Sequence, residues 1–289
     1  MKRMAFIIGI LSLAVGIAFA IAAPKSKPLG LNWSSLLRMA EVFFSFAIVL
    51  SISRGKFNPL LIIASFFLSL ALVAELYEAS MPGKIFILGF SGSEHARLTI
   101  TWLIFALALE AGAKVRISLP LIAAVVTWLA EVSTRLRGIS IFGFDPRLFL
   151  VTTNIWLLLA VSFGLQERRG TKKITRTVMA AAIFGLAMGL VMKIASFTIS
   201  TLDFRSFLKF SETSFLLAIA LHISKGRPTS GLIAAAIVLF IGTFAKLANT
   251  PILNMSGAVY MRIAMPCALL AIAAQAISKG RDCFIQDAK

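Results

Sequence analysis

The sequence predicts an all-α integral membrane protein, a bundle of about ten transmembrane helices with the N- and C-termini in the cytoplasm. Two observations predict this class. Of the 289 residues, 59% are hydrophobic and only 14% are charged, whereas a soluble domain carries roughly 25% charged residues. Apolar stretches of the ~20 residues that a spanning helix needs also follow one another along the whole chain.

Ten stretches meet this requirement: residues 4–23, 33–52, 58–77, 96–113, 118–134, 146–165, 174–198, 206–224, 229–248 and 256–278. Polar and apolar residues do not alternate within them, as they would in the strands of a membrane barrel. Because backbone groups in lipid must be satisfied inside a helix or a closed barrel, we expect helices. The connections are too short for a soluble domain, so residues 1–289 are expected to form a single transmembrane domain.

The first stretch has a second interpretation. Lys2 and Arg3, an apolar run, and the small residues Ala20 and Ala22 resemble a secretory signal peptide. Pro24 follows the candidate cleavage site and disfavours processing. We therefore interpret residues 1–23 as an extra first helix or an uncleaved signal anchor. The topology of the remaining helices is the same in either case.

Basic residues orient the bundle. With the N-terminus in the cytoplasm, the inner side holds 16 of the 29 Lys and Arg residues and a net charge of +12; the outer side holds +5, which completes the total of +17. Short basic inner loops follow the positive-inside rule, and they attract anionic membrane lipid. No basic soluble domain is expected, so we predict no nucleic-acid partner. The predicted location is the cytoplasmic (inner) membrane of a prokaryote, crossed many times.

Charged side chains within the predicted spans gather on one side of the membrane. Each costs ~2.5–3.5 kcal/mol in the hydrocarbon region and needs a physical reason. Apart from Glu110 and His222, they lie near the starts of inward-running helices and the ends of outward-running ones, which is the outer half throughout. Arg38 and Glu41 are three residues apart on one helix face, where they can neutralise each other. Lys209 and Glu212 repeat that spacing.

Two interpretations of this asymmetry stay open. Long side chains near helix ends can extend to the interface, and for Arg97, Arg135, Arg147 and Lys246 this interpretation has equal weight. Carboxylates are too short to do so, and interfacial extension alone would decorate both leaflets equally. We therefore expect a polar cavity or docking surface that opens to the outer face.

Several kinds of chemistry lack their residues. His95 and His222 are expected on opposite sides of the membrane, so no haem with two His ligands is expected. No Walker, Asp-rich magnesium or His-Glu zinc motif is present, and we expect no metal site. Cys267 and Cys283 have neither a plausible disulfide nor a metal-ligand spacing. Carboxylates beside Lys and Arg, within reach of lipid, suit a quinone, whose reduction takes up two electrons and two protons.

One loop and the helix after it resemble a known family. The segment Pro82-Gly83-Lys84-Ile85-Phe86 follows a predicted helix, and Ser91, Ser93 and Glu94 open the next. This pattern resembles the P-x-[RK]-x-F loop, Ser-rich turn and Glu of the membrane anchor subunits in the dimethyl sulfoxide reductase and polysulfide reductase family. Glu78 stands where that family has a histidine.

Other positions extend the resemblance. Trp33, with Glu41 later in its helix, resembles the family's first helix, and Pro146 resembles the start of its proline-led fifth helix. Residues 33–250 match the family's eight-helix core in helix order and sidedness. Residues 256–278 then form an extra last helix.

The resemblance implies a membrane anchor without haem. Such an anchor binds menaquinone or another quinone near the outer face. It exchanges electrons with an iron-sulfur subunit that serves a catalytic subunit of the molybdenum class on the outer side. Lys246 stands where the family has an acidic residue. We expect carboxylates to relay protons and cations to bind the quinone oxygens, which gives Glu41, Glu78, Glu131 and Glu212 as catalytic residues and Arg38, Lys84, Lys193 and Arg262 as cofactor-binding residues.

The strongest alternative is a ten-helix secondary transporter of a small metabolite. Transporters usually place the site near the midplane, at the interface of inverted repeats. Here the charges avoid the midplane, and the halves 1–140 and 141–289 show no convincing similarity. An intramembrane lipid-modifying enzyme and a purely structural subunit are further alternatives, and the first of these lacks a recognisable nucleophile or metal motif.

Overall fold

The computed structural model describes residues 1–23, 31–53, 58–80, 86–87, 90–111, 118–141, 143–169, 172–253, 255–280 and 284. This part of the chain forms ten helices: α1 (Lys2–Ala22), α2 (Trp33–Ile52), α3 (Pro59–Ser80), α4 (Gly92–Ala111), α5 (Leu119–Arg137), α6 (Pro146–Arg169), α7 (Lys173–Ile194), α8 (Phe204–Ile223), α9 (Ser230–Leu247) and α10 (Gly257–Lys279). Each coincides with one of the ten predicted stretches, so the all-helical prediction is confirmed.

The helix α4 differs most from the prediction. It begins four residues earlier, because the Glu94 carboxylate accepts hydrogen bonds from the backbone N–H and the hydroxyl of Ser91, both at 2.9 Å. This is half of a capping box. Nine of the ten described helices are long and apolar enough to cross a membrane. The exception is α4, since Glu94, His95 and Arg97 occupy its first two turns.

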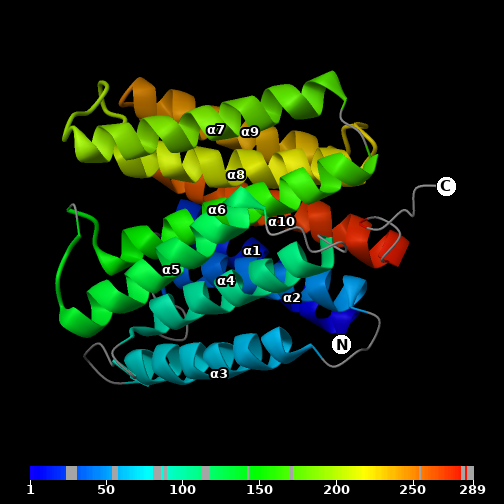
Figure 1. Ribbon diagram of the computed structural model, residues 1–289, viewed down its shortest axis with the longest axis horizontal. Coiled ribbons are helices and arrows are strands. Elements are labelled where there is room, and N and C mark those ends of the chain that lie inside the picture. Colours follow the sequence, from blue (N-terminus) through cyan, green and yellow to red (C-terminus); the bar gives the residue numbers. More distant parts are fainter. Residues whose placement is uncertain are drawn as a thin grey trace.

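The helices form five hairpins arranged in two layers (Figure 1). Each odd-numbered helix packs against the even-numbered helix that follows it. The even-numbered helices contact one another in the order α2, α4, α6, α8, α10 and back to α2, which closes an inner ring. All five inner helices therefore run in the same direction, and the odd-numbered helices surround them in the opposite direction.

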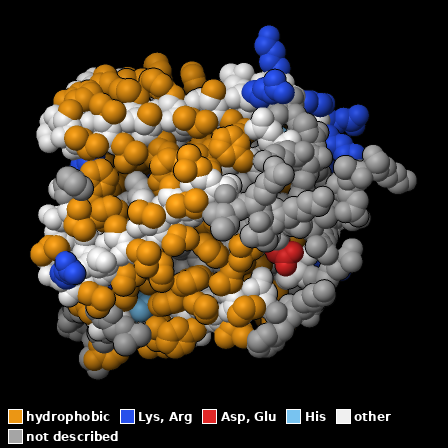
Figure 2. All heavy atoms as spheres, viewed as in Figure 1, with side chains coloured by type: hydrophobic (Ala, Val, Ile, Leu, Met, Phe, Trp, Pro, Cys, Tyr) orange, Lys and Arg blue, Asp and Glu red, His pale blue; other side chains and the backbone are white. Residues whose placement is uncertain are grey.

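Burial separates the two layers. Among the candidate spans, the outer helices have 22% to 33% of their residues buried, and the inner helices have 61% to 83%. Large apolar side chains on the outer helices are exposed, including Phe66, Phe184 and Phe240. Figure 2 shows one face of the bundle, where hydrophobic side chains cover most of the surface and Lys and Arg gather at the end that holds both termini in Figure 1.

Small residues let the outer helices approach the inner ring. A methyl group added at Gly189 of α7 would lie 2.9 Å from Leu208 of α8, and one at Gly9 of α1 would lie 2.7 Å from Phe44 of α2. Gly242 of α9 faces the backbone of Met261 in α10 in the same way. Close approach over small residues is the usual way to pack helices in lipid, where no hydrophobic force drives them together.

The connections from outer to inner helix share one structure. In each described case two residues exchange both backbone hydrogen bonds across a two-residue turn, with N···O distances of 2.9–3.3 Å. The paired residues are Ile87 and Phe90, Ile141 and Phe144, Ile199 and Leu202, and Ile252 and Met255. In the last three of these connections, the residue three positions before the first paired residue has a positive φ and ends the region of the outer helix. These residues are Gly138 (63°), Ser196 (54°) and Asn249 (51°).

The residue after each turn starts the inner helix. The side chains of Asp145 and Asp203 each accept a hydrogen bond from the backbone N–H three residues later, at 2.7 Å and 3.0 Å. The side chain of Asn32 does the same for α2 at 2.8 Å. Ser91 and Ser256 occupy the same place before α4 and α10. Side-chain oxygens at this position satisfy backbone donors that a helix start leaves free.

The fold is therefore built from five similar units, a repeat that we did not predict from the sequence. Five units do not divide into two equal halves, in agreement with the lack of convincing similarity between residues 1–140 and 141–289. Residues 256–278, set apart from an eight-helix core in the sequence-based domain scheme, contain most of α10, which closes the inner ring between α8 and α2.

Substitution of Gly242 tests the close packing of α9 on α10. The new methyl group would lie 2.8 Å from the Met261 backbone nitrogen, whereas one at Gly231 meets Ala271 at 3.3 Å. We expect Gly242→Ala to destabilise the protein by ~1–3 kcal/mol, as overpacked sites do, and Gly231→Ala to cost less. Thermal unfolding in detergent measures both, and equal effects would contradict this account of the packing.

Candidate functional site

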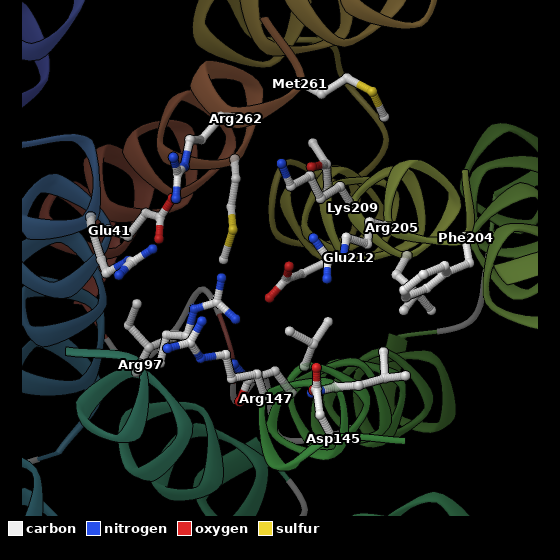
Figure 3. A pocket seen from close by; sticks show the side chains of 18 of the residues that line it. Glu41, Arg97, Asp145, Arg147, Phe204, Arg205, Lys209, Glu212, Met261 and Arg262 are labelled. Carbon is white, nitrogen blue, oxygen red and sulfur yellow. The ribbon is translucent and has the colours of Figure 1, made fainter. Parts of the chain in front are cut away.

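A polar cavity of about 450 Å³ lies inside the inner ring, at the end where the inner helices begin. Its lining residues come from α2, α4, α6, α8 and α10, with Asp145 from the position before α6 and Lys193 from the outer helix α7. Figure 3 shows their side chains surrounding a central space, into which Glu212 points, while Arg262 extends toward Glu41. The cavity has the size of sites that hold small molecules.

The lining repeats with the helices. We count from the residue directly before each inner helix: Asn32, Ser91, Asp145, Asp203 and Ser256. The sixth residue after this position lines the cavity in all five units, and so does the ninth. We call the first set the basic layer: Arg38, Arg97, Val151, Lys209 and Arg262. We call the second set the mixed layer: Glu41, Ile100, Asn154, Glu212 and Met265. Residues three apart lie on the same helix face, about one turn deeper in the ring.

The cavity carries an excess of positive charge. Seven cations line it, namely Arg38, Arg97, Arg147, Lys193, Arg205, Lys209 and Arg262, against the three carboxylates Glu41, Asp145 and Glu212. Arg97 interacts electrostatically with Arg38, Lys209 and Arg262. Among the described residues, no carboxylate lies within 4.0 Å of the cations of the basic layer.

The N-termini of all five inner helices add to this field. Each helix start carries a partial positive charge from its aligned peptide dipoles, and this charge favours anions in the first turn. In the described bundle the five starts surround one cavity. The unpaired cations of the basic layer repel one another in a partly dehydrated site, and a bound anion would relieve that repulsion.

Contacts along the wall fix the cation side chains. Arg38 donates a hydrogen bond from Nη1 to the Ser93 carbonyl at 3.0 Å. The Arg262 guanidinium lies 5.6 Å from the centre of the Trp33 ring. Arg147 donates from Nε to Glu94 at 2.9 Å. These contacts hold the charged groups in place before any ligand arrives, which lowers the entropy cost of binding.

Below the mixed layer the ring axis is closed by apolar side chains. The thirteenth and sixteenth residues of each inner helix continue the same face. They are Ser45, Ile104, Leu158, Leu216 and Leu269, and then Ile48, Leu107, Val161, Ile219 and Ile272, all of them buried. We call them the apolar plug. The cavity is thus open at one end of the described bundle and closed toward the other.

Cations at the ends of the outer helices connect neighbouring units. Arg135 in α5 forms ion pairs with Glu94 of α4 at 3.4 Å and with Glu131 at 2.9 Å. Lys246 in α9 forms one with Asp203, which starts α8, at 3.3 Å. Like Arg135 and Lys246, Lys193 lies six residues before the first paired residue of the following turn, and its side chain lines the cavity. Each cation thus contacts the preceding unit or lies in the cavity beside it.

The structure brings together five of the eight predicted site residues. Arg38, Glu41, Lys193, Glu212 and Arg262 all line the cavity. The other three do not contribute to the described lining. Glu131 is buried on the outer helix α5 and paired with Arg135, Glu78 is half-buried at the end of the outer helix α3, and Lys84 lies outside the described residues.

Sequence reasoning missed several lining residues. Arg97 and Arg147 had equal weight as interfacial side chains, and Arg205 and Asp145 were not considered. The signal for them is the spacing from the helix starts: Arg147 and Arg205 both follow by two residues, and Arg97 and Lys209 both follow by six. That spacing becomes visible once the chain is divided into five units.

Comparison with models of known protein families, with curated proteins and with solved structures gives no match for this chain.

Arg135 provides a test of the contacts between units. It neutralises Glu94 and Glu131, whose side chains are 7% and 1% exposed. Glu94 also pairs with Arg147, so the loss of Arg135 leaves chiefly Glu131 uncompensated. Loss of one partner from a buried pair typically costs ~3–5 kcal/mol. We expect Arg135→Gln to destabilise the protein by up to about that much, and Arg137→Gln, at an exposed site two residues on, to have little effect. Chemical unfolding in detergent compares the two variants.

Asp203 provides a test by pH. Burial alone would raise the pKa of this carboxyl, but hydrogen bonds from Ser206 and the nearby Lys246 ammonium lower its pKa below the ordinary value. A lowered native pKa stabilises the fold above the unfolded pKa of ~3.9, and this contribution is lost as the pH falls through the native pKa. The contribution of the Asp203–Lys246 pair to the free energy of unfolding is under about 1 kcal/mol, since solvent reaches both side chains.

We therefore expect Asp203→Asn to lower the melting temperature at pH 7 and to match the wild type more closely below pH 4. Asn retains the helix-capping oxygen, so the variant isolates the charge. For Lys246→Met, the difference in melting temperature from the wild type should also become smaller below pH 4, because this variant lacks the cation that pairs with Asp203. A stability difference that stayed constant across this pH range would contradict the assignment.

Proposed function

We propose that the chain is an integral membrane protein of the cytoplasmic membrane, with both termini in the cytoplasm and the cavity open to the outer face. The nine helices of spanning length and the exposed apolar side chains of the outer layer support membrane insertion. The Lys and Arg side chains gathered at the end that holds the termini support the orientation.

We further propose that the protein binds a small anion in the cavity and moves it across the membrane. The observation that carries this proposal is the basic layer, four cations that face one axial space and have no paired carboxylate among the described residues. The site lies on the axis of a closed ring. A path along that axis leads to the opposite face once the apolar plug opens.

This proposal takes up the transporter alternative in a changed form. Two arguments from the sequence stood against it, the lack of two convincingly similar halves and the distance of the charges from the midplane. The five-unit architecture removes the need for two halves. The site is displaced from the midplane toward the open end, with the apolar plug as the barrier on the other side. A dewetted apolar constriction is a known form of gate in membrane pathways.

A quinone-reactive anchor is the second candidate. Five of the residues expected for it share the cavity, and Glu41 and Glu212 stand beside cations there. In that case Arg and Lys would bind the quinone oxygens and a Glu would carry protons, with an iron-sulfur subunit and its catalytic molybdenum subunit docked on the outer side. The closed ring of inner helices favours a water-soluble ligand over it, because an isoprenoid tail needs a lateral exit to lipid.

Anion binding by the purified protein distinguishes the two. We expect inorganic phosphate or sulfate to raise the melting temperature in detergent and to be taken up by proteoliposomes. Arg97→Gln and Lys209→Gln should each weaken binding by about tenfold or more, since a hydrogen bond to a charged group contributes ~1.5–3 kcal/mol. The control Arg137→Gln removes a positive charge outside the cavity lining and should leave binding unchanged.

The same preparation tests the quinone candidate with a menaquinone analogue. Stabilisation by the analogue, lost in Glu41→Gln and Lys193→Met, together with no response to any anion, would refute anion transport and support the anchor. Stabilisation by phosphate or sulfate that persists in the presence of the menaquinone analogue would support anion transport and refute the anchor.

A further inference from the structure

The two layers of the cavity carry opposite kinds of group at a fixed separation. The basic layer holds four cations, and the mixed layer, three residues further along each inner helix, holds Glu41 and Glu212. At a rise of 1.5 Å per residue, the layers lie about 4.5 Å apart along the ring axis. A ligand that fills the cavity therefore meets positive charge first and negative charge about one turn deeper.

A simple anion does not suit both layers. An anionic group held by Arg97 and Lys209 would lie one turn above two carboxylates, which repel it. Among the described residues, neither Glu41 nor Glu212 has a cation within 4.0 Å, so the basic layer compensates them only at longer range. Both are less than one-tenth exposed, and each also repels the other. A positive group placed between them would add the close partner that buried carboxylates need.

Resting on the proposed anion site, we propose that its ligand is a small zwitterion. The anionic group, a phosphonate, phosphate, sulfonate or carboxylate, binds in the basic layer. An ammonium group on the same molecule binds between Glu41 and Glu212. The separation of the layers selects ligands whose two charges are joined by a short carbon chain of two or three atoms.

The remaining residues of the mixed layer agree with this assignment. Ile100 and Met265 present apolar surface for the carbon chain. Asn154 accepts a hydrogen bond from Thr101 at 2.7 Å, which fixes its side chain on the wall of the cavity. The apolar plug below offers no further polar partner at this depth except Ser45. The ammonium group is thus the deepest charged group that the cavity accommodates.

Free solutes and phospholipid headgroups both offer this chemistry, as in phosphoethanolamine. The closed inner ring favours the free solute, because a lipid would have to pass its acyl chains between inner helices. Phosphatidylethanolamine therefore enters the test as a competitor, and displacement of the soluble ligand by this lipid in nanodiscs would assign the site to a headgroup.

The test compares 2-aminoethylphosphonate with ethylphosphonate, which lacks the ammonium group. We expect the zwitterion to bind the wild-type protein roughly tenfold more tightly or better, since the ammonium gains two charge-assisted contacts. The double variant Glu41→Gln and Glu212→Gln should lose this preference and should bind ethylphosphonate more tightly than the wild type does. That gain also shows that the variant is folded. Calorimetric titration in detergent measures all four affinities.

Three outcomes would overturn the assignment. Equal binding of the two phosphonates by the wild-type protein would leave anion binding intact and remove the zwitterion. A preference for 2-aminoethylphosphonate that persists in the double variant would place the ammonium away from Glu41 and Glu212. Binding of neither phosphonate, with no response to phosphate or sulfate, would remove the proposed function itself.

Discussion

The structure depends on the common direction of the five inner helices. Each is preceded by an outer helix, and in the four described connections a tight two-residue turn separates the two, so all five inner helices start at the same end of the described bundle. Their helix dipoles therefore add at that end, and so do the cations placed six residues after four of the five starts. Other features of the site follow from this arrangement: its polarity, its depth and its position on the ring axis.

The outer helices are joined to the inner ring at the same end of the bundle. Their last turns provide the contacts, where Arg135 and Lys246 pair with carboxylates of the preceding unit. Small residues such as Gly189 and Gly242 allow the outer helices to come close enough for these contacts. Packing in the outer layer and electrostatics in the inner layer are thus parts of one arrangement, in which each unit supports its neighbour.

The apolar plug gives the cavity its polarity along the axis. The axial face of the inner ring is polar near the helix starts and, except for Ser45, aliphatic at the thirteenth and sixteenth residues of each inner helix, so the cavity ends at the mixed layer. For the transport proposed above, this plug would have to open before a ligand could cross.

Sequence reasoning reached the helices and part of the site for clear physical reasons. Long apolar runs need no tertiary contact to be recognised, and Arg38 with Glu41, or Lys209 with Glu212, stand out because charge inside such a run is costly. Glu131 and Glu78 stood out equally and lie elsewhere, on the outer helices α5 and α3. Since the hydropathies of the inner and outer spans overlap, hydropathy alone does not tell which helices surround the axis.

The sequence by itself thus determined that ten helices form. It also determined that the charged side chains within these helices gather at the end where the inner helices begin, since both follow from each segment taken alone. Only the tertiary structure decided which charges meet. Ring closure between α10 and α2 brings Arg262 and Glu41, more than 200 residues apart in the chain, into one cavity. That closure depends on packing between helices, which no single segment encodes.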